Sequence, residues 1–301
     1  MKVRLCGAGA VGLTVAHKLK DVSDFRIIAS GERLERYKRN GFLFNGKKEE
    51  LSLISPDDAD KADLLIVAVK NFHLSKALEE IAPFVSEDTL ILSLLNGIDA
   101  ERVISERFGA ANVLYSFITD LSATHEGNST VCFSDGGIII FGEKNNSISE
   151  RVKKIAGLFD EAGQRYRIPA DIMHEKWWKF TLNCCFNTLS ATIGANYMAM
   201  SENAHLVRAV RMIANEILSV AKAEGVSLSH DDVDAVIKMV LSHHDKGKTS
   251  MLQDVEAGRM TENDYFLGTL SRLGRMHGIL TPCSDLAYNL LEARRHTLAV
   301  H

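Results

Sequence analysis

The chain opens with Met1-Lys-Val-Arg-Leu-Cys-Gly-Ala-Gly-Ala-Val-Gly-Leu-Thr-Val-Ala-His-Lys-Leu19, in which a short strand pattern leads through G-x-G-x-x-G directly into a helical pattern. Gly7 permits a tight turn, Gly9 lets backbone approach a pyrophosphate, and Gly12 allows helix and strand to pack closely. The N-terminus of the helix supplies N–H groups and a partial positive charge. This context predicts a dinucleotide-binding loop formed by Gly7, Ala8, Gly9, Ala10, Val11 and Gly12.

The first part of the chain alternates strand and helix patterns. Three near-continuous apolar runs are typical of parallel strands covered on both faces: residues 64–69, 89–95 and 112–117. This alternation predicts an α/β fold, with an N-terminal doubly wound Rossmann-type parallel sheet in residues 1–168. Two later runs, residues 129–133 and 137–141, predict a β-hairpin appended to that sheet.

Beyond Pro169 the apolar periodicity is helical throughout. Residues 169–301 are therefore predicted to form an all-helical substrate and catalytic domain, following the dinucleotide-binding domain of residues 1–168. The expected helices are residues 149–162 in the first domain and 174–189, 204–224, 230–242, 250 onward, 262–277 and 284–295 in the second.

The residues at the end of the predicted second strand, residues 25–30, indicate whether the chain prefers NAD or NADP. NAD-preferring folds usually carry an acidic residue about 20 positions beyond the glycines, where it binds the ribose 2′-hydroxyl. Here the strand ends in Ser30, and Arg33 follows within one turn. A hydroxyl and a guanidinium suit a 2′-phosphate better, which predicts NADP (NADPH). NAD stays open because Glu32 is close by, and the basic residues also fit a solvated helix face.

Polar residues follow two further strands of the predicted sheet. Lys70 follows residues 64–69, and Asn96 follows residues 89–95. Ligands bind outside the carboxyl ends of such strands, so both side chains are expected to face the cofactor. The alternative for Lys70 is an ordinary surface lysine.

Lys179, Asn183 and Asn187 recur at every fourth residue of an otherwise apolar helical stretch. At about 3.6 residues per turn, these three side chains share one stripe of the helix. An ammonium and two carboxamides on a buried face need hydrogen-bonding partners. A bound polar ligand is one such partner, and neighbouring backbone is the other.

Composition narrows the class of protein. The 301 residues are 46% hydrophobic, enough for two cores, and the net charge of -4 argues against a nucleic-acid surface. No apolar run reaches the roughly 18 residues of a membrane span, and no secretory signal is recognised, so a cytoplasmic location is expected. The cysteines show no C-x-x-C spacing, and no metal site is expected; they are interpreted as small buried hydrophobes.

Together these motifs carry a family resemblance. The glycine loop, Val69-Lys70, Asn96-Gly97, Trp178-Lys179 with the two asparagines, and Ser250-Met-Leu-Gln-Asp254 with Thr261-Glu262 resemble the ketopantoate reductases (2-dehydropantoate 2-reductases). The match covers nearly the whole chain in the same order. It implies an oxidoreductase that reduces 2-dehydropantoate to D-pantoate with NADPH, a step of pantothenate and coenzyme A biosynthesis.

The resemblance also implies roles for individual residues. Lys179 is implied to be the general acid. The implied substrate-binding residues are Asn183, Asn187, Asn196 and Ser250. The cofactor-binding residues, besides the glycine loop, are expected to be Ser30, Arg33, Lys70, Asn96, Ala123 and Glu262. Two of these positions also fit helix capping: Ser250 with Gln253 matches a capping box, and Thr261 with Glu262 matches an N-cap followed by an acid.

Two positions depart from the family pattern, and the one at Ser30 leaves the cofactor and the substrate open. The family often has Arg where this chain has Ser30, and Pro where it has Thr188. One alternative is a family relative that reduces another branched or aromatic 2-keto acid with NADH or NADPH. The other is a non-catalytic NADP-binding sensor, since fold does not fix function. A homodimer is also left open.

Overall fold

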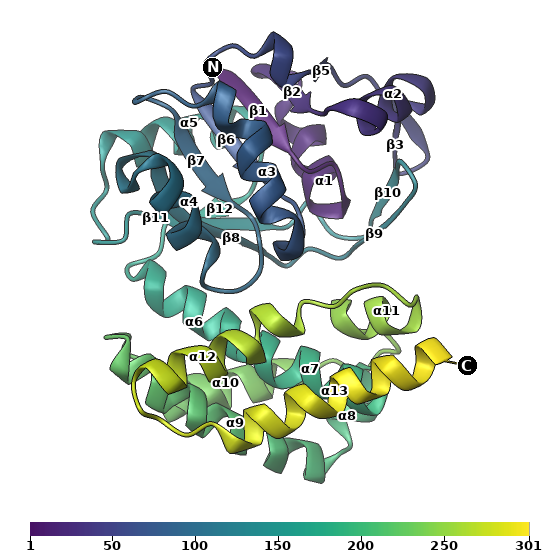
Figure 1. The fold of residues 1–301 in the computed structure, drawn as a ribbon, viewed down its shortest axis with the longest axis vertical. Coiled ribbons are helices and arrows are strands. Elements are labelled where there is room, and N and C mark those ends of the chain that lie inside the picture. The colour runs from purple at the N-terminus through teal and green to yellow at the C-terminus, as the bar shows by residue number, and fades with distance from the viewer. Residues whose placement is uncertain (301) are drawn as a thin grey trace. The chain divides into compact units, whose positions relative to one another are not determined.

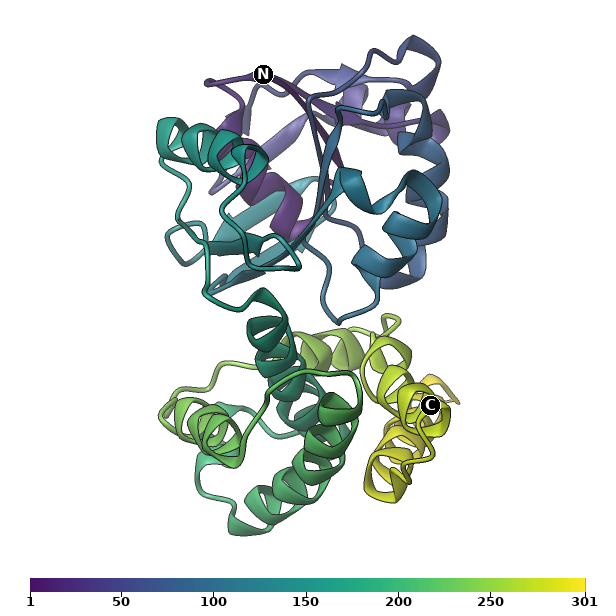
Figure 2. The same ribbon diagram turned by 90° about the vertical axis from the view of Figure 1, so that its left-hand side faces the viewer.

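The computed structural model describes residues 1–300, and the side chains of residues 1–298. The chain divides into two compact units, drawn in Figures 1 and 2. The first contains Met1–Asn96 and Ala100–Ile172, and the second contains Gly97–Asp99 and the residues from Met173 onward. The second unit thus begins four residues beyond the predicted boundary after residue 168, and it takes in a short piece of an earlier loop.

An eight-stranded sheet forms the centre of the first unit, with the strand order β12-β11-β8-β7-β6-β1-β2-β5. Its strands are β1 Lys2–Cys6, β2 Asp24–Ile28, β5 Leu53–Ile54, β6 Leu64–Val67, β7 Leu90–Ser93, β8 Val113–Thr119, β11 Ile138–Gly142 and β12 Tyr166–Arg167. Neighbouring strands are parallel, except that β8 and β11 are antiparallel. The predicted Rossmann-type fold is confirmed, and two strands, β11 and β12, run opposite to the other six strands of the sheet.

Helices cover both faces of this sheet, as Figure 2 shows. They are α1 Ala10–Leu19, α2 Gly31–Asn40, α3 Leu74–Ile81, α4 Ala100–Phe108 and α5 Glu150–Ala162. Successive strand residues point to opposite faces: Leu5 of β1 lies in the core with α1 and α5, and Cys6 lies in the core with α3 and α4. Burial on both faces explains why these strands read as continuous apolar runs.

The predicted hairpin of residues 129–133 and 137–141 is wrong. Strand β10 (Ser129–Cys132) belongs to a separate four-stranded sheet, β4-β3-β10-β9, with β3 Phe42–Phe44, β4 Lys47–Glu49 and β9 Ala123–Glu126. Strand β11 pairs with β8 instead. The reason is burial: Ile139, Ile140 and Phe141 are all at most 1% exposed, which requires a strand covered on both faces, whereas β10 buries only Thr130. The small sheet packs against α1.

The second unit is helical. Its helices are α6 Ile172–Leu182 (which starts at the last residue of the first unit), a π-helix Asn183–Asn187, α7 Thr188–Ile193, α8 Tyr197–Ser201, α9 Ala204–Ala223, α10 His230–Leu241, α11 Ser250–Glu256, α12 Leu267–Met276 and α13 Pro282–Val300. Short 3₁₀ turns occur at Pro56–Asp58, Asn71–His73, Ala82–Phe84, Ala110–Asn112 and Asn263–Tyr265. Among the described residues, no helix is both long and apolar enough to cross a membrane.

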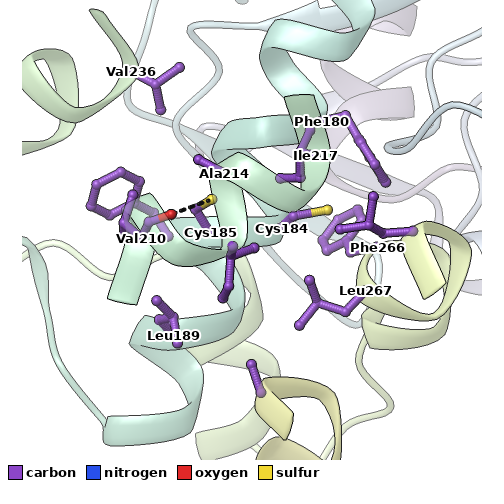
Figure 3. Packing of buried hydrophobic residues seen from close by; sticks show 14 of the residues in the cluster. Phe180, Cys184, Cys185, Leu189, Val210, Ala214, Ile217, Val236, Phe266 and Leu267 are labelled. Carbon is purple, nitrogen blue, oxygen red and sulfur yellow. Dashed lines mark hydrogen bonds between the residues drawn. The ribbon is translucent and has the colours of Figure 1, made fainter. Parts of the chain in front are cut away.

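The core of this unit surrounds the π-helix. Cys184 and Cys185 are fully buried and point to different sides, Cys185 toward Val210 and Cys184 toward the side of Phe266 (Figure 3). The Cys185 thiol donates to the Val210 carbonyl at 3.7 Å. Burial raises the pKa of both thiols, Cys184 and Cys185, so they stay protonated and pack as small apolar groups.

Candidate active site

The glycine loop connects β1 to α1 and has the geometry that a pyrophosphate requires. A Cβ on Gly7, whose φ is +106°, would lie 2.6 Å from the carbonyl of Ala68, and a Cβ on Gly12 would lie 1.8 Å from the Gly7 oxygen. A Cβ added to Gly9, by contrast, would have no atom within 4 Å. Gly9 is the N-cap of α1 and forms no side-chain capping hydrogen bond. The open space over this helix N-terminus therefore fits an anionic group of a dinucleotide.

Ser30 and Arg33 lie where β2 passes into α2, and both contact the same carboxylate. Ser30 is the N-cap residue of α2, and its hydroxyl donates to Oε1 of Glu80 at 3.0 Å. Arg33 donates to Oε2 of Glu80 in an ion pair. Burial lowers the pKa of Arg33, but the hydrogen bond and the charge of Glu80 outweigh it, so the net pKa is raised. The two residues predicted to bind a 2′-phosphate thus already bind an acid.

Lys70 and Asn96 lie in neighbouring loops at the carboxyl edge of the sheet. Lys70 precedes the 3₁₀ turn that follows β6, and Asn96 follows β7, which pairs with β6 in parallel. The side chain of Asn71 donates to the Asn96 carbonyl at 2.9 Å and joins the two loops. The contact of either side chain with a cofactor stays a prediction.

The π-helix sets the geometry of the predicted substrate residues. The sequence predicts one uninterrupted α-helix over residues 174–189, but the N–H of Thr188 donates to the carbonyl of Asn183, five residues back. This i→i+5 bonding widens one turn, and such π-turns are frequent at functional sites. The Thr188 hydroxyl reaches the same carbonyl at 3.5 Å. A proline at this position would lack the N–H, so the departure at Thr188 adds a bond to the π-turn.

Within that turn the two carboxamides contact each other. Nδ2 of Asn187 donates to Oδ1 of Asn183 at 2.9 Å, so the predicted common stripe holds for this pair. Asn183 is only 3% exposed, and none of the described residues accepts a hydrogen bond from its Nδ2. Leaving such a buried donor unpaired costs about 1–3 kcal/mol. This N–H therefore has room in its hydrogen-bonding capacity for an acceptor oxygen, and its contact with a ligand stays a prediction. Lys179 precedes the pair on α6 and is partly buried.

The second predicted substrate element is the N-terminus of α11, which packs against α7 and the π-helix. Its cap is Thr249, not Ser250: Thr249 accepts from the N–H of Leu252, and its hydroxyl lies 2.5 Å from that of Ser190. The capping box predicted for Ser250 and Gln253 is therefore wrong, because the buried hydroxyl one residue earlier takes that position. Ser250 is exposed in the first turn, so its side chain is not committed to the cap.

The remaining predicted residues have mixed placements. Asn196 is the N-cap of α8 and accepts from the N–H of Ala199 at 2.9 Å, so its side chain has a structural role. Ala123 lies in β9 of the small sheet. Glu262 is 4% exposed and precedes the 3₁₀ turn Asn263–Tyr265. The N-cap predicted for Thr261 is wrong, since its hydroxyl is buried without a hydrogen bond to any described residue.

A hollow on α12 and α13 contains none of the predicted site residues. It is lined by Asp264, Gly268, Thr269, Ser271, Arg272, Arg275, Asp285, Tyr288 and Asn289. Its polar groups largely satisfy one another, as in the contacts of Ser271 with Asp285 and of Tyr288 with Asp264. The chemistry expected of this chain therefore points to the π-helix and the glycine loop instead.

Two family models match this chain, one over the part that contains the glycine loop and one over the part that contains the π-helix. Residues 3–146 match the family Ketopantoate reductase PanE/ApbA, and residues 171–295 match the family Ketopantoate reductase PanE/ApbA C terminal. The chain belongs to the ketopantoate reductase family. The matched ranges contain the glycine loop, the Asn183–Asn187 turn and Ser250, so the family assignment rests on both units.

Individual members of the ketopantoate reductase family and related structures are similar over the full length. The 2-dehydropantoate 2-reductase of Lactococcus lactis subsp. lactis (strain IL1403) is 30% identical, with 99% of each chain covered. The structure of D-mandelate dehydrogenase with NADH and anilino(oxo)acetate has a TM-score of 0.89 at 27% identity, covering 99% of this chain and 100% of that one. The 2-dehydropantoate 2-reductase from Geobacter metallireducens GS-15 has a TM-score of 0.84 at 26% identity, covering 96% and 99%.

Glu80 is the polar residue of the site region that the sequence does not reveal. It follows Glu79 in an amphipathic helix, and both read as surface acids. In the structure Glu79 is exposed, whereas Glu80 is 9% exposed and contacts Ser30 and Arg33. The nearest signal is helical phase, because Glu80 falls beside the apolar stripe of Leu74, Ala77, Leu78 and Ile81.

Proposed function

We propose that this member of the ketopantoate reductase family reduces a 2-keto acid to the 2-hydroxy acid with a nicotinamide dinucleotide, and that 2-dehydropantoate, giving D-pantoate, is the first substrate to test. The observation that carries the proposal is the buried, unclaimed N–H of Asn183 beside Asn187, one turn beyond Lys179. A hydroxyl or carboxylate oxygen of the substrate would accept from it.

The chain's own residues have distinct tasks in this reaction. A nicotinamide dinucleotide held at the glycine loop would supply a hydride for the keto carbon, and the ketone oxygen would then require one proton and stabilisation of its negative charge. Lys179 is the proposed general acid: its ammonium stabilises the developing negative charge and then donates the proton to that oxygen. Asn183 and Asn187 hold the substrate so that this oxygen faces Lys179. Ser250, whose side chain is exposed in the first turn of α11 and does not form the cap, donates a hydrogen bond to the substrate carboxylate.

The cofactor site follows the glycine loop. The first turn of α1 and the space over Gly9 would hold the pyrophosphate, and Lys70 and Asn96 lie at the same edge of the sheet. Glu262 is proposed to close the site near cofactor and substrate, as the resemblance implies. The NADPH preference expected from Ser30 and Arg33, the place in pantothenate biosynthesis and the cytoplasmic location remain predictions. The contacts of Ser30 and Arg33 with Glu80 favour NADH instead.

A second candidate is an NADH-dependent reductase of aromatic or branched 2-keto acids. It is favoured by similarity to a D-mandelate dehydrogenase whose structure contains NADH, and by the acid beside Ser30. The chemistry at Lys179 is the same for both candidates, because proton transfer to the alkoxide does not depend on the rest of the substrate. A non-catalytic NADP-binding sensor would not require Lys179 together with its two asparagines.

The test is the initial rate of NADPH and, separately, NADH oxidation by the purified chain. The substrates are 2-dehydropantoate, 2-ketoisovalerate and phenylpyruvate. Selective turnover of 2-dehydropantoate supports the first candidate, and selective turnover of phenylpyruvate or 2-ketoisovalerate supports the second. Tight dinucleotide binding without turnover of any keto acid would refute both and favour the sensor. A homodimer is checked by analytical ultracentrifugation of the same preparation.

A further inference from the structure

Glu80 lies at the edge of the sheet where the adenosine half of a dinucleotide is expected. It is on α3, which follows β6, and it contacts Ser30, which follows β2. It also lies near the end of β1: the pKa of Cys6, directly before Gly7, is raised to about 12, first by burial and then by the negative charge of Glu80. Glu80 therefore lies near the carboxyl ends of the adjacent parallel strands β1 and β2.

The carboxylate occupies both donors that a 2′-phosphate would need. Ser30 donates to one oxygen of Glu80 at 3.0 Å, and Arg33 donates to the other. At 9% exposure, the carboxylate of Glu80 is largely removed from water, and these two donors supply its hydrogen bonds. If a 2′-phosphate formed an ion pair with Arg33 in place of Glu80, the buried negative charge of Glu80 would lose its cationic partner. The phosphate would also place a second negative group beside that carboxylate.

The same arrangement suits an unphosphorylated ribose. A 2′-hydroxyl carries no charge and can donate a hydrogen bond to a carboxylate. NAD-preferring Rossmann folds use an acid for this purpose, usually placed near the end of the second strand. Here Ser30 follows that strand, and Glu80, on a helix that follows β6, places an acid beside it.

We propose that Glu80 is a specificity-determining residue that makes this chain prefer NADH to NADPH. The inference rests on the proposed dinucleotide binding, but not on any particular keto acid. It is the opposite of the NADPH preference expected from Ser30 and Arg33, because the hydrogen bonds and the charge of these two residues are directed to the carboxylate of Glu80.

The experiment measures dissociation constants of NADH and NADPH without any keto acid, from the quenching of protein fluorescence and the enhancement of nicotinamide fluorescence. The proteins are the wild type, Glu80→Gln and Glu79→Gln. Glu79 is the matched control, because it is the adjacent acid on the same helix and is exposed. Thermal unfolding of each variant checks that it is folded.

The expected result is that the wild type binds NADH at least tenfold more tightly than NADPH. Glu80→Gln keeps the shape of the side chain but removes its charge, so NADPH should bind at least tenfold more tightly than it does to the wild type. Glu79→Gln should leave both constants within twofold. Stronger binding of NADPH by the wild type would overturn the inference without using any variant, as would an unchanged NADPH constant in folded Glu80→Gln.

The outcome also separates this inference from the proposed function. If the wild type binds neither dinucleotide, the proposed function fails and the inference fails with it. If the wild type binds NADPH more tightly and reduces a 2-keto acid, the proposed function stands and only the assignment of Glu80 is overturned.

Discussion

Replacing Gly12 by alanine should damage both the stability of the first unit and its cofactor loop. The added Cβ would lie 1.8 Å from the carbonyl oxygen of Gly7, against an ordinary contact distance of at least 3.4 Å, so the two atoms must separate by about 1.6 Å. The neighbour is backbone and cannot rotate away. Gly7 itself is held against the Ala68 carbonyl, from which a Cβ on Gly7 would be only 2.6 Å away.

The distance of this clash gives the expected size of the loss in unfolding free energy. Overpacking a core commonly costs about 1–3 kcal/mol and sometimes more, and a clash between two backbone segments belongs at the upper end. We therefore expect the unfolding free energy of Gly12→Ala to fall by about 3 kcal/mol or more. For a unit of this size each kcal/mol shifts the melting temperature by about 2–4 °C, so the melting temperature should fall by roughly 6–12 °C.

Gly9→Ala is the matched control in the same loop. Gly9 has φ -87° and ψ -162°, which any residue adopts, and a Cβ added there would have no atom within 4 Å. Its melting temperature should stay the same or rise slightly, since Gly to Ala at a compatible site stabilises by about 0.4–1 kcal/mol. The new methyl group would, however, stand where a pyrophosphate approaches. Its dinucleotide dissociation constant should rise at least tenfold.

Two assays read these effects: thermal unfolding followed by circular dichroism, and dinucleotide binding followed by fluorescence. Gly12→Ala should lose stability and binding together, and Gly9→Ala should lose binding alone. A Gly12→Ala protein that melts at the wild-type temperature would refute the reasoning about the loop's packing. A Gly9→Ala protein that binds dinucleotide as the wild type does would show that the open space over α1 is not the pyrophosphate site.

Three further predictions address the site and the fold. Lys179→Ala should lower kcat by about 10²-fold or more with dinucleotide binding intact, and an unchanged kcat would remove Lys179 from the mechanism. Thr249→Ala should lower the unfolding free energy by about 0.5–2 kcal/mol through loss of a cap, whereas Ser250→Ala should leave stability unchanged and raise the KM for the keto acid; denaturant unfolding and steady-state kinetics test this pair. Burial raises the pKa of Asp60, but hydrogen bonds from Arg4 and Lys2 outweigh it, and the net pKa is lowered. The ionised Asp60 therefore stabilises the fold, and this contribution to the unfolding free energy should be lost as the pH falls below about 4. Asp60→Asn should make the unfolding free energy, measured with urea, fall less steeply with decreasing pH in this range.

The local part of the fold follows from the sequence because its determinants are short-range. The helix predicted from residue 149 begins with Ser149 accepting from the N–H of Val152, and it ends at Gly163 in the left-handed conformation. Both signals lie within a few residues of the helix. The glycine loop is partly of the same kind, since the contact between Gly12 and Gly7 and the open space at Gly9 lie within the loop, whereas Gly7 also packs against Ala68, which is distant in sequence.

Other features depend on contacts distant in sequence. Strand β10 pairs in parallel with β3, more than 80 residues earlier, and no local pattern specifies that partner. The π-turn is likewise hidden, because residues 183–187 have the same apolar periodicity as an ordinary α-helix. The position of the π-turn determines how the carboxamides of Asn183 and Asn187 contact each other. The sequence therefore predicts both residues as candidates, but it does not show that the Nδ2 group of Asn183 has no acceptor among the described residues.

The loop after β2 shows how one such distant contact bears on the interpretation of cofactor preference. Ser30 and Arg33 alone are good phosphate donors, and the sequence therefore favours NADPH. A carboxylate buried as deeply as that of Glu80 must have hydrogen-bond donors, and the structure supplies it with these two. Their presence is then explained by the fold itself, without any phosphate. Helical phase places Glu80 nearer than Glu79 to the apolar stripe of its helix, but it does not give the contacts of Glu80 with Ser30 and Arg33. On the proposed role of Glu80, these contacts set the charge that a ribose 2′-substituent would meet.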